Sequence, residues 1–165
     1  MPAGVVVTAA AADLLGRLQQ RHGRVMFHQS GGCCDGSSPM CYPVGDFLVG
    51  DRDVLLGVLD VGDEGVEVWI SGPQYQAHYR GEKRTQLVID VVPGRGGGFS
   101  LEAPEGVRFL SRGRAFTDEE KAELETESVI TGAVYQRGER PPVRGPVIDP
   151  VNYEAVPETC PPRIP

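Results

Sequence analysis

Three of the chain's four cysteines lie in one short segment, HQSGGCCDGSSPMC, which covers residues 28–41. Thiolates and imidazole are the ligands that zinc, copper(I) and iron–sulfur clusters prefer. The glycines of the segment permit the turns that would bring several side chains to one ion. The segment is therefore a candidate metal or cluster site. Its primary ligands are expected to be Cys33, Cys34 and Cys41, with His28 and Asp35 helping.

The spacing of the cysteines leaves other readings open. Consecutive Cα atoms lie about 3.8 Å apart and a relaxed disulfide joins Cα atoms about 4.4–6.8 Å apart, which disfavours a bond between Cys33 and Cys34. In an extended strand these two would point to opposite faces, so we expect one to ligate and the other to face the core. The chain has no C-x-x-C pair, which disfavours a closed structural zinc site. Buried reduced thiols, or a redox disulfide from Cys41 to Cys33 or Cys34, remain alternatives.

The charge balance restricts the partners. The chain has 165 residues, with 16 basic and 23 acidic side chains and a formal net charge of −7. That balance disfavours nucleic acid, because binding phosphates needs a basic face. The apolar run at residues 5–12 is too short to span a bilayer and lacks a basic leading segment. We therefore expect no membrane association and a cytoplasmic location, where thiols stay reduced.

The elements that would position this segment follow from periodicity and turn residues. Thr8 can cap a helix that runs to His22, and Gly23 can end it. Short apolar runs separated by Gly, Pro and Asp predict strands. They lie at residues 25–28, 47–49, 54–59, 66–70, 87–92, 99–101 and 107–110. The pattern predicts a compact, mainly β (α+β) domain with an N-terminal helix.

A different composition starts near Phe116. Residues 1–116 are expected to form the metal- or cluster-binding domain, and residues 117–165 a C-terminal extension. Thr117 and Glu120 form a capping-box pattern that opens a short acidic helix. The Pro-rich sequence beyond Gly138 is expected to be extended, or ordered only against a partner.

A glycine-rich run, PGRGGGF at residues 93–99, could be mistaken for a phosphate loop. No Lys-Ser or Lys-Thr follows it, so a sharp connection between two strands is favoured. If this turn approaches the cysteine segment, Glu102 becomes a candidate oxygen ligand.

Two segments of the chain resemble a known family. Residues 25–43, which hold VMFHQSGGCCDGSSPMCYP, and residues 89–109, IDVVPGRGGGFSLEAPEGVRF, are similar to the bacterial family called domain of unknown function 779. The resemblance covers roughly residues 8–116. Members of that family are often encoded beside aldehyde dehydrogenases. The resemblance therefore implies a link to aldehyde or alcohol metabolism, with an aldehyde dehydrogenase or alcohol-oxidising enzyme as partner.

A more distant likeness is to the A-type iron–sulfur carrier (HesB-like) fold. On that comparison Cys34 lies where those proteins carry their first cluster cysteine, and Ile89-Asp90 and Gly98-Phe99 fall on later strands. The likeness implies a HesB-like fold and is compatible with a homodimer. The carriers end in a Cys-Gly-Cys pair, whereas residues 105–116 contain no cysteine. The departure implies a self-contained site supplied by Cys33, Cys41 and His28.

The function expected from these residues is a small metal- or iron–sulfur-binding protein, an accessory or carrier for aldehyde or alcohol oxidation. Its cofactor would be an iron–sulfur cluster or a mononuclear iron, zinc or copper ion. One alternative is a mononuclear metal-dependent enzyme acting on a small aldehyde or thiol adduct. Another is a non-catalytic partner of an aldehyde dehydrogenase that uses the Pro-rich tail as its contact. The residues leave open whether the protein is an enzyme.

Overall fold

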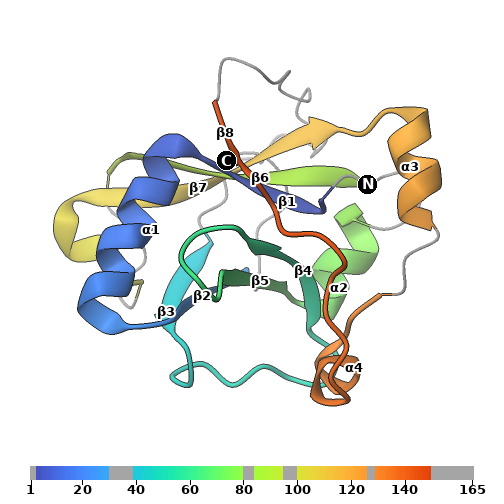
Figure 1. The fold of residues 1–165 in the computed structure, drawn as a ribbon, viewed down its shortest axis with the longest axis horizontal. Coiled ribbons are helices and arrows are strands. Elements are labelled where there is room, and N and C mark those ends of the chain that lie inside the picture. Colours follow the sequence, from blue (N-terminus) through green and yellow to red (C-terminus); the bar gives the residue numbers. More distant parts are fainter. Residues whose placement is uncertain (1–2, 30–38, 80–83, 95–99, 126–128, 150–165) are drawn as a thin grey trace, which may run out of the picture.

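The computed structural model describes residues 3–29, 39–79, 84–94, 100–125 and 129–149. In this part of the chain two four-stranded sheets lie against each other (Figure 1). The first sheet has the order β7-β6-β1-β8, and the second has the order β3-β2-β5-β4. The β-rich fold with an N-terminal helix is as predicted.

The first sheet, sheet A, contains β1 (Val5–Thr8), β6 (Thr85–Pro93), β7 (Val107–Ala115) and β8 (Val147–Ile148). In it β1 is parallel to β6 and to β8, while β6 and β7 are antiparallel. The second sheet, sheet B, contains β2 (Val25–Gln29), β3 (Met40–Pro43), β4 (Val54–Leu59) and β5 (Val66–Ile70). Here β2 is parallel to β5, and the β2–β3 and β4–β5 pairs are antiparallel.

The N-terminal helix α1 (Ala9–His22) begins and ends where its capping residues predict. The Thr8 hydroxyl accepts a hydrogen bond from the Ala11 N–H at 3.3 Å. Gly23 follows with φ of 77°, a left-handed conformation that glycine adopts without steric cost. The buried stripe of Leu14, Leu15 and Leu18 packs into the core between the sheets.

The main core lies between the two sheets and joins strands that are distant in sequence. Phe27 of β2 and Phe109 of β7 meet edge to face, with ring centroids 4.8 Å apart. A smaller apolar cluster, built on Met26, Leu55 and Trp69, covers the other face of sheet B. Sheet B therefore has two buried faces, and a side chain's place in its strand decides which one it enters.

Two of the predicted strands are wrong. Residues 47–49 are a loop, because Phe47 turns back to stack on Tyr42 with ring centroids 4.9 Å apart and does not join a sheet. Of residues 99–101, Phe99 lies outside the described residues, and Ser100 and Leu101 form a turn before the 3₁₀-helix η3 (Ala103–Glu105). The strands β1, β3 and β8 were not predicted.

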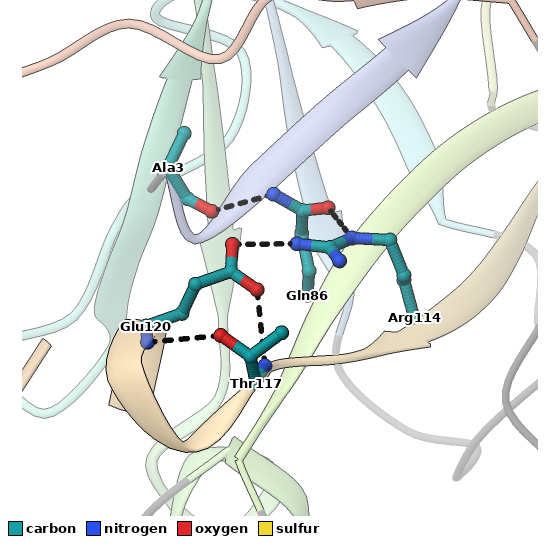
Figure 2. Close-up of polar contacts among 5 residues, drawn as sticks. All are labelled: Ala3, Gln86, Arg114, Thr117 and Glu120. Carbon is teal, nitrogen blue, oxygen red and sulfur yellow. Dashed lines mark hydrogen bonds and ion pairs between the residues drawn. The ribbon is translucent and has the colours of Figure 1, made fainter. Parts of the chain in front are cut away.

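The capping box at Thr117 is confirmed, and it opens α3 (Asp118–Glu125). The Thr117 N–H donates to the Glu120 carboxylate at 3.0 Å, and the Glu120 N–H donates to the Thr117 hydroxyl at 3.1 Å. Arg114 of β7 lies between Gln86 and Glu120 and bonds to both, while the Gln86 amide donates to the carbonyl of Ala3 (Figure 2). This network ties α3 to sheet A.

After β5 a three-residue helix, α2 (Gly72–Gln74), leads into a π-helical turn at Tyr75–Tyr79.

The described part of the predicted extension contacts both sheets. The helix α4 (Gly132–Gln136) packs beside β4 of sheet B, and β8 pairs with β1 of sheet A. The Tyr135 hydroxyl donates to the Glu67 carboxylate of β5. Gly145 forms a parallel bridge with Leu59 before the chain enters β8. The boundary at residue 116 stays a prediction. Among the described helices, none is long and apolar enough to cross a membrane.

Candidate functional site

The β2–β3 pair positions the two predicted ligands that the structure describes. Phe27 lies opposite Cys41, and His28 lies opposite Met40. Residues opposite each other share a face of the sheet, and neighbours along a strand point to opposite faces. Cys41 therefore enters the core between the sheets, and His28 lies on the other face. The structure does not bring these two side chains together.

The other predicted ligands, Cys33, Cys34 and Asp35, lie outside the described residues. Within the described ranges, no group of three or more His, Cys, Asp or Glu side chains is arranged to hold a metal ion. The complete predicted ligand set is therefore untested, and the described residues show only the surroundings of Cys41 and of His28.

Cys41 lies on β3, the edge strand of sheet B, and the turn after the glycine-rich run covers that edge. The Cys41 N–H donates to the Ser100 hydroxyl at 2.8 Å. The Leu101 N–H donates to the carbonyl of Cys41 at 3.0 Å. The segment that follows residue 99 thus reaches the cysteine segment at Cys41, which is the approach that would make Glu102 a candidate ligand.

Glu102 is a carboxylate inside the protein, with 1% of its surface exposed. It accepts hydrogen bonds from the Ser100 hydroxyl and from the backbone N–H groups of Glu102 and Phe109. Because Phe109 belongs to β7, the edge strand of sheet A, this turn links the edges of both sheets. Burial raises the pKa of Glu102, and the three hydrogen bonds oppose that rise without cancelling it.

The Cys41 thiol is fully buried among apolar side chains. Burial raises its pKa well above the ordinary value, and the nearby Glu102 carboxylate raises it further. A thiol with a raised pKa stays protonated near neutral pH, so Cys41 is a poor nucleophile. To ligate a metal it must exchange its proton for the cation.

A second polar contact crosses the core, on the face of sheet B that Phe27 and Cys41 share. Gln29 and Ser111 are both buried, and the Ser111 hydroxyl donates to the Gln29 side-chain oxygen at 2.7 Å. The Gln29 side-chain nitrogen is also buried, and within the described structure it has no hydrogen-bond partner. Buried polar groups are nearly always satisfied, so an amide end of this kind identifies a candidate position for a polar ligand. Gln29 was not predicted as a site residue. The only signal in the sequence is that a polar residue ends an apolar strand.

His28 has a different set of neighbours on the outer face of sheet B. Its Nε2 lies 3.2 Å from the Asp53 carboxylate, and its ring stacks on Phe47 with centroids 4.3 Å apart. Asp53 also accepts a hydrogen bond from the Gly50 N–H at 2.9 Å. His28 thus joins the strand to the 47–53 loop. Asp53 was not predicted, because a residue distant in sequence from His28 gives no local signal.

Comparison with known proteins places the chain in a family. The family model described as Domain of unknown function (DUF779) matches residues 14–115. The chain belongs to this family. The matched range includes β2, β3 and the Ser100–Glu102 turn, whereas α3, α4 and β8 lie beyond it. No curated protein and no solved structure matches the chain, so the HesB-like likeness stays a prediction.

Proposed function

We propose that this DUF779 protein binds a metal ion or an iron–sulfur cluster at the corner where the cysteine segment joins β3. In this proposal Cys33, Cys34 and Cys41 supply thiolates, and Asp35 assists. The protein would serve in the cytoplasm as an accessory or carrier for an aldehyde dehydrogenase or another alcohol-oxidising enzyme. The proposal includes a homodimer, and this part of it rests on the HesB-like likeness alone.

The observation that carries the proposal is the burial of Cys41 together with Glu102 at this corner. Both groups form anions on losing their protons, and both have raised pKa values because they are removed from water. Two such groups side by side destabilise each other when charged, and a bound cation would relieve that repulsion. Ser100 holds the arrangement by bonding to the Cys41 backbone and to Glu102.

The faces of sheet B also refine the ligand set. His28 lies on the opposite face from Cys41, so we propose Glu102 in its place. A carboxylate oxygen beside thiolates suits zinc or iron better than copper(I), which prefers soft ligands. Iron–sulfur clusters are usually held by cysteine alone, so direct ligation by Glu102 would favour a mononuclear ion over a cluster.

Elemental analysis and an absorption spectrum of anaerobically purified protein test the proposal. We expect bound zinc or iron in the native chain, and its loss in Cys41→Val and Glu102→Gln. The glutamine variant keeps most of the size and an oxygen acceptor while removing the charge. His28→Gln is the matched control on the other face of the same hairpin, and it should keep its metal.

The outcomes separate the competing readings. Protein that holds no metal, and takes up none on anaerobic reconstitution with iron or zinc, rules the proposal out. If Cys41→Val retains the metal and the stability of the native chain, Cys41 is a core residue and the ligands lie elsewhere. A cysteine-dependent visible absorption that survives in Glu102→Gln would indicate a cluster held by thiolates alone.

One observation favours a second candidate, a mononuclear metal enzyme that acts on a small aldehyde or thiol adduct. The buried Gln29 side-chain nitrogen lies on the same sheet face as Cys41 and could donate to a substrate oxygen. Turnover of a small aldehyde that Gln29→Met reduces while the bound metal is unchanged would support this reading. Absence of turnover in metal-loaded protein would leave the carrier role.

A further inference from the structure

A small pocket lies at the outer edge of sheet B, distinct from the Cys41 corner. Its volume is about 40 Å³, and the wall includes Leu56 of β4, Tyr75 and Arg84. Ile130 and Pro141 also line it. Those two residues lie beyond the range that the DUF779 model matches, so the pocket is completed by this chain's own C-terminal segment.

The pocket arises where the pairing of β4 is irregular. Leu55 lies opposite Trp69, but Gly57 lies opposite Val68, so Leu56 is an extra residue in the strand. A bulge of this kind bends the strand and leaves one residue unpaired, and bulges are frequent beside binding sites. The C-terminal segment covers the edge at this point. The Leu55 N–H donates to the carbonyl of Ile130 at 2.8 Å.

A close backbone approach fixes that cover. A Cβ atom built on Gly132 would lie 2.1 Å from the carbonyl oxygen of Gly50, so only glycine fits there. The Gly132 N–H donates to the carbonyl of Asp53 at 2.8 Å, and α4 lies beside β4 (Figure 1). With Pro141 restricting the chain further on, the wall is held by rigid backbone.

One residue of the pocket wall, Arg84, carries a positive charge. Within the described residues Arg84 makes no ion pair or hydrogen bond, although it is partly buried. The hydroxyl of the buried Tyr75 likewise has no hydrogen bond in the described structure. A guanidinium and a phenol hydroxyl both donate hydrogen bonds, and a planar guanidinium fits a carboxylate with two parallel bonds.

We propose that this pocket binds a small monocarboxylate, with Arg84 and Tyr75 on the carboxylate and Leu56, Ile130 and Pro141 around the alkyl group. The volume leaves room for about three water-sized spheres, which limits the ligand to the size of acetate. The net charge of −7 selects against ligands with several negative charges. This site is independent of the proposed metal centre.

Titration of sodium acetate into the full chain, followed by NMR chemical shifts, tests the proposal. We expect saturable shifts centred on the pocket residues, and a Kd raised about tenfold or more in Arg84→Gln, as for a lost charge-assisted hydrogen bond. Arg84→Lys should bind with intermediate affinity, since it keeps the charge but not the two parallel bonds. Arg21→Gln removes an exposed charge on α1 and should bind as the native chain does.

Neutral acetamide has nearly the same shape as acetate and supplies the remaining control. Binding of acetate but not acetamide supports recognition of the charge. Equal shifts with both compounds, or acetate shifts that Arg84→Gln leaves unchanged, would overturn the proposal. Lack of any saturable shift with acetate in the folded native chain would overturn it as well.

Discussion

The two faces of sheet B place chemically active side chains from one hairpin in different surroundings. On the inner face Cys41 lies in an apolar core, with Glu102 and Ser100 supplied by a turn at the edge of both sheets. On the outer face His28 pairs with Asp53 under the ring of Phe47, which a loop supplies. The inner groups are fully enclosed, whereas Asp53 retains 17% exposure. Residues that are neighbours in sequence therefore need not share a site.

Truncation of aromatic rings should show the largest difference between the faces. Phe27→Ala should lower the free energy of unfolding by about 3–5 kcal/mol, because it opens a cavity between the sheets. Phe47→Ala removes a half-buried ring from a loop and should cost about 1–2 kcal/mol. Urea denaturation of both variants measures this, and equal losses would mean that the outer cluster is as tightly packed as the core.

Removal of a hydrogen-bond or ion-pair partner should also lower the free energy of unfolding more on the inner face than on the outer face, but by a smaller margin. Ser100→Ala leaves the buried Cys41 N–H without its acceptor and should cost about 2–3 kcal/mol. Asp53→Ala on the outer face should cost about 1 kcal/mol, because water can reach His28 once the partly exposed carboxylate is gone. The same denaturation measurement checks this ranking. A larger loss in Asp53→Ala would reverse it.

The pH dependence of stability should give the smallest effect. Its sign should differ between a fully buried carboxyl, Glu102, and a partly exposed one, Glu120. The pKa of Glu102 is raised above 4.5 by burial, so its folded form binds more protons than its unfolded form. The free energy of unfolding of the metal-free protein should therefore fall as pH rises from 4.5 through the folded pKa. Glu102→Gln should remove this decrease.

Glu120 provides the opposite case. Burial acts to raise its pKa, but hydrogen bonds from Thr117 and Arg114 outweigh burial and lower the pKa below 4.5. Its contribution to stability is present above 4.5 and is lost as pH falls through the folded pKa. Urea denaturation of Glu102→Gln and Glu120→Gln tests the sign of each contribution. The measurements should run from about pH 3 to pH 7, where the two carboxyl groups titrate. If both variants changed the pH profile in the same direction, the assignment for Glu102 would be wrong.

Much of the fold could be predicted where signals are local. The limits of α1 follow from Thr8 and Gly23, and the predicted strands at residues 54–59 and 66–70 coincide with β4 and β5. The strand predicted at residues 47–49 is wrong, because an apolar residue such as Phe47 gives the same signal in a loop as in a strand. The contact with Tyr42 that holds Phe47 in the loop has no local signal in the sequence. Strand β3 was not predicted, because Met40–Pro43 is continuous in sequence with the Gly- and Ser-rich cysteine segment, whose composition indicates a loop.

The candidate site was likewise predicted only where its signals are local in sequence. From the sequence alone it follows that thiols are concentrated beside a strand and that Glu102 comes after a turn that could approach them. The pairing of distant segments in three dimensions places Cys41 and His28 on opposite faces, with Ser100 and Asp53 as their respective neighbours. This difference arises because caps and turns form between residues that are only a few positions apart in sequence. The face and partners of a strand residue depend instead on the register between strands that are distant in sequence.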